Sequence, residues 1–491
     1  MPILVVVNKP KDWPLHVPDV EVVSARSYLT DPRFSQARGV KVFNLCRSYR
    51  YQSLGYYVSL LAGARGHKTF PSIATVQDMK TVSIARLLSD DLEEVIEESL
   101  KPVQSDSFTL SVYFGRNMAK RHERLAMQLF KLFQAPLLRA EFSKEKAGWQ
   151  LWTIRPIPAN EIPEPHWPFV IESATRFFQN GTPAPSRRPH ARYDIAFLVN
   201  PEEKDPPSDP KALQHFVKAA RRLGMDAELI DREDYGRLPE FDALFIRETT
   251  NVDHHTFRFS RRAAAEGLVV IDDPDSILKC SNKVYLAELL ERHRILTPKT
   301  LIVHKRNKDA LREQIGFPCI LKQPDSSFSQ GVYKVEDEAT LERTLELLLE
   351  DSELIIAQEF LPTDFDWRVG IIDRQPLYVC KYFMARRHWK IQHTDRVGKT
   401  HFGKVETFTV EEAPAEVVRT ALRAANLIGD GFYGVDLKQI GPKIQVIEIN
   451  DNPSIEAGYE DRVLKEGLYM EIMGVFLSRI EQRKQPIRRD E

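Results

Sequence analysis

The stretch GFYGVDLKQIGPKIQVIEINDNPS, residues 431–454, constrains the fold of this 491-residue chain more than any other. Two runs that suit strands, 434–440 and 443–449, flank the dipeptide Gly441-Pro442. Such runs on either side of a glycine-proline turn predict a hairpin of two short β-strands. We therefore expect paired strands, and an α+β arrangement, in the C-terminal half of the chain.

Three oxygen-bearing side chains lie at the ends of these paired strands. Asp436 is on the first strand, and Glu448 and Asn450 are two residues apart on the second. Carboxylate and amide oxygens are hard ligands that suit magnesium or manganese, and these ions complete an octahedron with water and phosphate oxygens. The hairpin therefore predicts a Mg²⁺ or Mn²⁺ site. The alternative is a hairpin with an acidic rim that binds no ion.

The composition is that of an ordinary globular protein. With 42% hydrophobic residues and about 150 residues per domain, the length predicts about three domains. The net charge of -1 gives no general attraction to nucleic acid or to an anionic membrane, and it permits a homo-oligomer. No apolar segment approaches the about 20 residues that a membrane span needs. We expect neither nucleic acid nor membrane as a partner.

The cysteines indicate the redox environment. They are far apart in the sequence, form no CxxC pair and lie mostly in apolar runs: Cys46, Cys280, Cys319 and Cys380. This pattern is typical of buried thiols in a reducing compartment. We therefore expect a cytoplasmic protein, and we do not expect a zinc site.

Prolines and the order of apolar runs divide the chain into parts. The first part alternates strand and helix patterns, which predicts an N-terminal α/β accessory domain. The next is crowded with prolines and predicts an extended connector, although its apolar island 169–178 could form a short helix. A second alternation of strands and helices predicts a small parallel α/β domain before the α+β part. The predicted parts are residues 1–154, 155–192, 193–280, 281–483 and a charged tail, 484–491.

Ligands of an open parallel sheet bind beyond the C-terminal ends of its strands, and Arg247 stands at such an end. Its planar guanidinium can hold a carboxylate through two parallel hydrogen bonds. We therefore expect Arg247 to bind a substrate carboxylate, with a surface ion pair as the alternative. Asn452 and Ser454, which follow the hairpin, are assigned to the same substrate.

Further polar residues precede the hairpin in a fixed order. Lys283 opens a predicted helix, and Lys322 ends a predicted strand before a serine-rich loop. Asp366 and Arg368 follow in the motif FDWRVGII. Over residues 193–483 this order, together with GVDL and VIEINDNPSIE, resembles the ATP-grasp ligases. It is most similar to their RimK branch, which joins amino acids such as glutamate to an acceptor carboxylate. The N-terminal part resembles the extension of some RimK-like proteins, and that resemblance implies no chemistry.

The resemblance implies a role for each matching residue. The metal ligands are the three hairpin residues, and Arg368 and Lys381 are expected near the transferred phosphoryl group and the oxyanion. The loop PDSSFSQGV departs from the glycine-rich loop of the family, since it keeps only Gly331. The residues expected to bind ATP are Lys283, Lys322, Ser329, Gln330, Gly331, Glu359, Phe360, Asp366, Lys390 and Gln392.

Together these features predict an ATP-dependent carboxylate-amine ligase with an ATP-grasp fold. An acyl phosphate would form from ATP and an acceptor carboxylate of a small molecule, a peptide or a protein tail. The amine of an amino acid would then displace phosphate. A phosphotransferase with the same fold and a protein that binds nucleotide without turnover are the alternatives.

Overall fold

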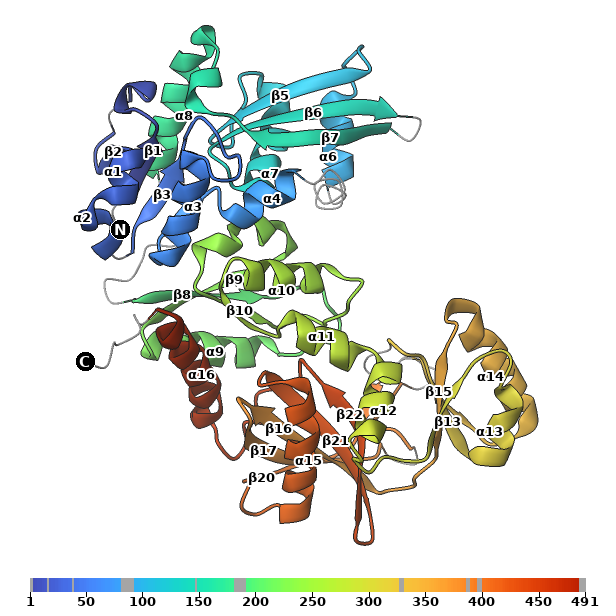
Figure 1. The fold of residues 1–491 in the computed structure, drawn as a ribbon. Helices are drawn as coiled ribbons and strands as arrows, with labels where there is room; N and C mark the ends of the chain where they lie inside the picture. Colours follow the sequence, from blue (N-terminus) through green and yellow to red (C-terminus); the bar gives the residue numbers. More distant parts are fainter. Residues whose placement is uncertain are drawn as a thin grey trace. The chain divides into compact units, whose positions relative to one another are not determined.

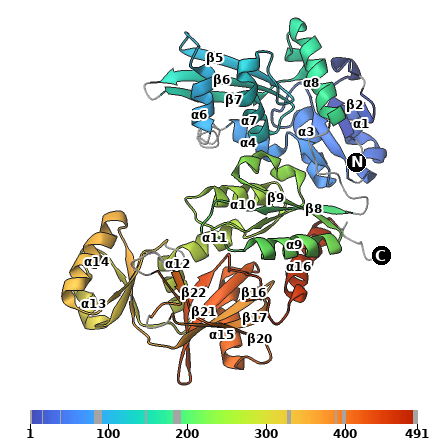
Figure 2. The same ribbon diagram turned by 180° about the vertical axis from the view of Figure 1, so that it is seen from behind.

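A computed structural model of the chain describes residues 3–15, 17–37, 39–80, 92–145, 148–180, 191–325, 331–385, 389–394 and 400–484. These residues form two compact units, and many of their elements are labelled in Figures 1 and 2. The first unit comprises Met1–His190 and Glu233–Phe241, and the second comprises Ala191–Arg232 and Asp242–Glu491. Within the described ranges, no helix is both long enough and apolar enough to cross a bilayer.

The first unit contains a parallel sheet and an antiparallel sheet. The run ILVVV forms β1, an inner strand of the parallel sheet β2-β1-β3-β4, and its buried side chains explain the uninterrupted apolar pattern. The antiparallel sheet has the order β5-β6-β7. The strands are β1 (Ile3–Val7), β2 (Val20–Ser24), β3 (Lys41–Asn44), β4 (Lys68–Phe70), β5 (Ser107–Tyr113), β6 (Leu137–Glu145) and β7 (Gly148–Pro156). The helices are α1 (Ala25–Thr30), α2 (Pro32–Gln36), α3 (Leu54–Ala64), α4 (Ile73–Lys80), α6 (Glu93–Leu100) and α7 (Glu123–Phe133).

Helix α8 (Trp167–Asn180) lies in the proline-rich region. Its residues Val170 and Ala174 are buried in the core of the first unit. Pro168 stands in the first turn, where its missing N–H costs no helical hydrogen bond. For these residues the structure shows the short helix that the sequence offered as an alternative, and not an extended connector.

The second unit begins with the predicted parallel sheet, in the order β11-β10-β8-β9. The last helix of the described residues, α16 (Glu466–Lys484), packs beside α9 (Pro210–Arg222), and both views show this (Figures 1 and 2). The strands are β8 (Tyr193–Leu198), β9 (Met225–Ile230), β10 (Ala243–Ile246) and β11 (Val269–Ile271). The other helices are α9 (Pro210–Arg222), α10 (His255–Ala265) and α11 (Pro274–Ser281).

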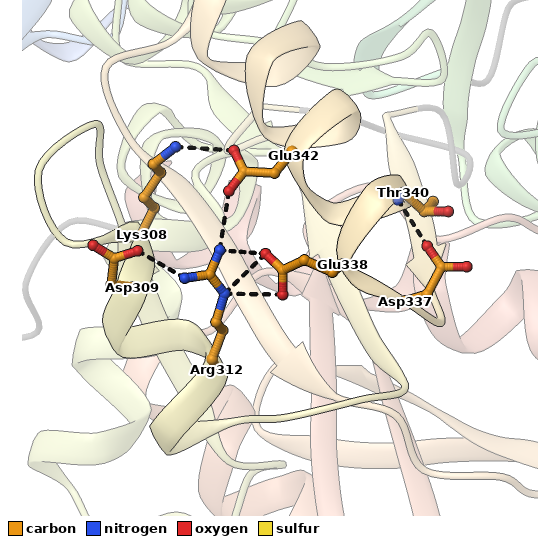
Figure 3. Close-up of polar contacts among 7 residues, drawn as sticks. All are labelled: Lys308, Asp309, Arg312, Asp337, Glu338, Thr340 and Glu342. Carbon is orange, nitrogen blue, oxygen red and sulfur yellow. Dashed lines mark hydrogen bonds and ion pairs between the residues drawn. The ribbon is translucent and has the colours of Figure 1, made fainter.

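An outer antiparallel sheet follows, in the order β12-β15-β13-β14, with α13 and α14 packed on it. Arg312 on α13 binds Glu338 and Glu342 on α14, and Asp337 caps α14 by accepting a hydrogen bond from Thr340 N (Figure 3). These ion pairs are exposed, so the apolar core contributes most of the stability of this layer. The strands are β12 (Thr300–Val303), β13 (Cys319–Lys322), β14 (Val332–Val335) and β15 (Ile355–Glu359). The helices are α12 (Lys283–Arg292), α13 (Lys308–Gln314) and α14 (Glu338–Asp351).

An inner antiparallel sheet, in the order β20-β17-β16-β21-β22, contains the predicted hairpin as β21 and β22. One face of this sheet packs on α15 (Ala415–Ile428) through alternate residues such as Val369, Val435 and Ile449. The residues between them point to the opposite face, where the candidate site lies. The strands are β16 (Phe365–Ile372), β17 (Gln375–Phe383), β20 (Val405–Phe408), β21 (Phe432–Ile440) and β22 (Lys443–Asn450). A separate pair consists of β18 (Gln392–Thr394) and β19 (Thr400–Phe402).

Candidate active site

A cavity of about 280 Å³ lies in the second unit, and its walls come from the outer and inner antiparallel sheets and from loops of that unit. The loop after β10 contributes Thr249, Thr250 and Asn251. Most of the residues that the sequence assigned to nucleotide, metal or substrate also line it. These are Lys283, Lys322, Glu359, Phe360, Asp366, Arg368, Lys390, Asp436, Glu448, Asn450, Asn452 and Ser454.

Three charged residues form a row across β16, β21 and β22. Arg368 is opposite Asp436, and Asp436 is opposite Glu448. Directly opposed residues of antiparallel strands share a face, so all three point away from α15 and into the cavity. Arg368 holds Asp436 through two parallel hydrogen bonds. The amide of Asn450 donates to Asp436 Oδ2 over 3.2 Å, and its rotation would present an oxygen instead.

The alignment of this row depends on a β-bulge in the hairpin. Leu437 pairs with Val446, whereas the preceding Asp436 pairs with Glu448, so Ile447 is an extra residue in β22. Because a bulge re-aims the side chains beside it, both Ile447 and Glu448 line the cavity. The two predicted carboxylate ligands are thereby brought to one face.

Two lysines stand beside Glu448. Lys283 Nζ lies 3.0 Å from Glu448 Oε1, and both Lys283 and Lys322 are less than one-tenth exposed. Burial lowers the pKa of Lys322 to about 8, although the charge of Glu448 opposes this shift. Lys283 is the first residue of α12, whose N-cap Asn282 accepts hydrogen bonds from two backbone N–H groups of the first turn. The end of β13 and the start of α12 therefore present two ammonium groups to the same cavity.

Lys438 is a cavity residue that sequence reasoning missed. Its Nζ donates to Asp366 Oδ1 over 2.5 Å and to Thr363 Oγ1 over 2.6 Å. Burial raises the pKa of the Asp366 carboxyl, while the charge of Lys438 opposes that rise. Strand alternation could have found this residue, because it lies two positions after Asp436 on the same strand and so points to the same side.

Aromatic rings contribute another part of the cavity wall. Phe360, just after β15, lies edge-on to Trp389 with ring centroids 6.1 Å apart. Lys390 Nζ donates to the carbonyl of Val332 over 2.9 Å, and burial lowers the pKa of Lys390. One oxygen of Glu359 accepts a hydrogen bond from the backbone N–H of Lys299. Such a wall suits a flat heterocycle flanked by polar groups.

The prediction that Lys381 is catalytic is wrong. Lys381 is opposite Trp367, whereas Cys380 is the residue opposite Arg368. Lys381 therefore points to the other face of the sheet, where its Nζ lies 4.6 Å from the ring of Phe365 and 4.7 Å from that of Trp367. The sequence interpretation placed it by resemblance and did not follow the alternation of the strand.

The prediction that Arg247 grips a substrate carboxylate is also wrong. Arg247 is only 1% exposed and does not line the cavity. Its Nε and terminal nitrogens donate to four acceptors of the protein: Ser208 Oγ, Asn452 Oδ1, and the carbonyls of Pro207 and Pro453. The Asn452 amide also donates to the carbonyl of Glu248 over 2.7 Å, so its side chain is engaged by the protein at both ends.

The other assigned residues are placed as follows. Gly331 does not line the cavity; it has a φ of +65° and accepts a hydrogen bond from Gln323 N at the base of the serine-rich loop. Ser329 and Gln330 lie outside the described residues. Gln392 belongs to β18, and its side chain is likewise outside the described part.

Comparison with known proteins identifies the family. Residues 280–466 match the RimK-like ATP-grasp domain, and residues 25–173 match the RimK-like ATP-grasp N-terminal domain. The alpha-aminoadipate–LysW ligase LysX of Sulfurisphaera tokodaii is 30% identical over 260 residues, which cover 49% of this chain and 86% of that protein. The chain belongs to the RimK-like ATP-grasp ligases. The predicted fold class, an ATP-grasp fold preceded by a parallel α/β layer and an N-terminal α/β region, is thereby confirmed.

Other similar proteins are also ligases or synthetases by name. A probable alpha-L-glutamate ligase of Marinomonas sp. is 24% identical over 260 residues, covering 50% of this RimK-like chain and 84% of that protein. The glutathione synthetase of Yersinia pestis is 29% identical over 254 residues, which cover 50% of this chain and 70% of that protein. Among solved structures, D-cycloserine synthetase DcsG has a TM-score of 0.46 and 17% identity, covering 58% of this chain and 99% of that one.

Proposed function

We propose that this RimK-like protein joins an amino acid to an acceptor carboxylate with ATP, through an acyl phosphate. The observation that carries the proposal is the row of Asp436 and Glu448 beside Lys283 and Lys322 in one cavity. Two acidic ligands and two ammonium groups suit a metal-bound triphosphate. The names of the relatives, which include a glutamate ligase and an aminoadipate–LysW ligase, favour a glutamate-like amino acid and an acceptor that is a small molecule, a peptide or a protein tail.

The donor set fits a hard divalent ion. Asp436, Glu448 and Asn450 are the residues that would hold Mg²⁺ or Mn²⁺. In the structure the cations of Arg368 and Lys283 already contact the two carboxylates, as a metal ion would. The bound ion supplies positive charge to the phosphate oxygens.

The lysines and the aromatic wall would position the nucleotide. Lys283 and Lys322 contact the phosphates and spread their negative charge, while Phe360 and Trp389 flank the base and Asp366 the ribose. A carboxylate oxygen of the acceptor attacks the γ-phosphorus, the bond to ADP breaks, and an acyl phosphate forms.

The second step, which forms the amide bond, takes place in the same cavity. The amine nitrogen of the amino acid attacks the acyl carbon, phosphate leaves with the electrons of the C–O bond, and the nitrogen loses its proton. Arg368, once Asp436 is neutralised by another cation, is free to stabilise the oxyanion. Thr249, Asn251 and Ser454 supply hydroxyl and amide groups that could orient the substrates.

The test is a matrix of amino acids and carboxylates, incubated with ATP and Mg²⁺ and read by ADP release and mass spectrometry. We expect ADP release that requires both partners, and a product whose mass is their sum less one water. A stable phosphorylated product formed without an amine would instead identify a phosphotransferase. The Glu448→Gln variant serves as the inactive control.

We place the reaction in the cytoplasm. All four cysteines are buried free thiols, which favours a reducing compartment. Burial also raises the pKa of Cys46 and of Cys380 to about 12, so neither thiol is reactive at neutral pH.

A further inference from the structure

A second group of metal-ligating side chains lies in the second unit, apart from the aspartate and glutamate of the hairpin. One ligand atom from each of Glu248, His254 and His255 lies within 4.8 Å of the others. Glu248 stands beyond the end of β10, His254 is the N-cap of α10, and His255 is the first residue of that helix. None of the three belongs to the set assigned to ATP or to its metal ion.

The carboxylate of Glu248 is buried and held in place. Its side chain is 3% exposed, Oε2 lies 2.9 Å from His255 Nε2, and Oε1 accepts a hydrogen bond from Asn200 Nδ2 over 3.3 Å. Metal-binding carboxylates are oriented by such hydrogen bonds. Asn452 Nδ2 also donates to the main-chain carbonyl of Glu248, which fixes the backbone at this point.

The charges around Glu248 favour a cation. Glu203 is close enough for Glu248 to contribute to the raised pKa of the Glu203 carboxyl, after the larger effect of burial. Asp253 and Arg258, which are charges of opposite sign, both act on the neighbouring His254. The amino-terminal end of α10 also opposes a cation, but a helix end carries only about half a unit charge. That is less than the full charge of one buried carboxylate.

The two histidines offer ring nitrogens that can bind a metal ion, and one of them can be reached from solvent. Each imidazole presents a ring nitrogen to the group, and the imidazole nitrogen of histidine is a common metal ligand. His254 is exposed to solvent, so an ion can enter. Its Nδ1 lies 3.1 Å from Thr256 Oγ1, and a hydrogen bond of this kind orients a ligating ring.

We propose that Glu248, His254 and His255 form a binding site for a borderline divalent ion of the Zn²⁺ class. Two imidazoles and one carboxylate suit such an ion, whereas the oxygen-only set of the hairpin suits Mg²⁺. The turn between Glu248 and His254 carries Thr249 and Asn251, which line the cavity. A bound ion therefore fixes this wall of the cavity, and its remaining coordination positions are taken by water or by a substrate oxygen.

The experiment uses the full-length protein, stripped of metal and then saturated with Mg²⁺ and ADP to occupy the nucleotide site. Co²⁺ is titrated as a spectroscopic probe, and Zn²⁺ is then added as a competitor. We expect one additional equivalent of Co²⁺ with ligand-field absorption, displaced by Zn²⁺. Glu248→Gln and His254→Ala should each weaken this binding by roughly 100-fold, and Asn200→Ala by roughly 10-fold.

The matched control is His293→Ala, which removes an exposed histidine at the C-terminal end of α12 and should leave Co²⁺ binding unchanged. His254 is exposed, so its replacement tests the site even if Glu248→Gln were to disturb folding. Absence of the additional equivalent would overturn the proposal. Binding that persists unchanged in His254→Ala, or that is lost equally in His293→Ala, would also overturn it. Ligase activity is not the readout, so the result is independent of the proposed reaction.

Discussion

Arg368 binds Asp436 in a bidentate pair, with Nε 2.6 Å from Oδ1 and Nη2 2.7 Å from Oδ2. Lys283 contacts Glu448 in the same row. Each of the two proposed carboxylate ligands is thus neutralised by a basic side chain of the protein. With a divalent ion held by these carboxylates, Arg368 and Lys283 would be available to contact the substrate.

The first prediction concerns these carboxylates. Asp436→Asn and Glu448→Gln keep the shape of the side chains but remove the negative charge that a divalent ion needs. We expect ADP release to fall by at least about 100-fold, while fluorescent ADP still binds. The control is Glu406→Gln on β20, since Glu406 is opposite Lys381 on the other face of the sheet. Full activity in either cavity variant would show that the proposed metal ligands are misassigned.

The second prediction compares two lysines of the inner sheet. Lys438→Met leaves the largely buried Asp366 without its countercharge, so we expect the free energy of unfolding to fall by about 2–3 kcal/mol. We also expect the KM for ATP to rise about tenfold, because Asp366 without its ion-pair partner no longer positions the nucleotide. Lys381→Met removes contacts with aromatic rings and should lower stability by only about 1 kcal/mol.

Steady-state kinetics and urea denaturation of both variants test this pair. The KM for ATP of Lys381→Met should equal that of the wild type. If the two substitutions raise KM equally, the assignment of Lys438 to the site face is wrong.

The third prediction concerns pH. Since the pKa of Lys322 is lowered to about 8, its amine is charged below pH 8 and becomes neutral as the pH rises above it. The charged form binds phosphate, so the KM for ATP should rise by up to about tenfold per pH unit above pH 8. Lys322→Arg remains charged over this range and should show a flat profile, whatever its absolute KM. A rise of the same size in the arginine variant would assign the titration to another group.

Much of this arrangement follows from sequence patterns that are local. The alternation of strand and helix patterns predicted the N-terminal α/β domain and the parallel sheet after residue 193, and the Gly441-Pro442 turn predicted the hairpin. Each signal needs only the period of a strand or a helix and the chemistry of a turn. Lys283 and Lys322 were found by their order in the chain, and the structure brings both to one cavity.

Other features depend on contacts that no local pattern encodes. A regular hairpin closed at Gly441-Pro442 would pair Asp436 with Ile447, and Glu448 would then point to the face that packs on α15. The bulge at Ile447 corrects this register, and an extra residue is invisible to the alternation alone. Arg247 was misassigned for a related reason, because its four acceptors come from loops about 40 and 205 residues away.

The fourth prediction concerns Arg247. It holds the turn at Asn452 and Pro453 against Pro207 and Ser208, and this turn directly follows the proposed ligand Asn450. Arg247→Met leaves buried acceptors without donors, so we expect the free energy of unfolding to fall by about 3–5 kcal/mol.

Because the same bonds fix the end of β22, the concentration of Mg²⁺ for half-maximal ADP release should rise about tenfold in Arg247→Met, measured at a temperature where the variant is folded. Arg247→Lys retains a charge and part of the hydrogen bonding, and it should recover part of the Mg²⁺ affinity. Arg222→Met, which removes an exposed ion pair of α9 with Glu466, is the control and should change neither quantity. If a variant at position 247 loses stability but keeps the wild-type Mg²⁺ dependence, Arg247 has only a structural role. The turn at Asn452 and Pro453 then has no effect on Mg²⁺ binding.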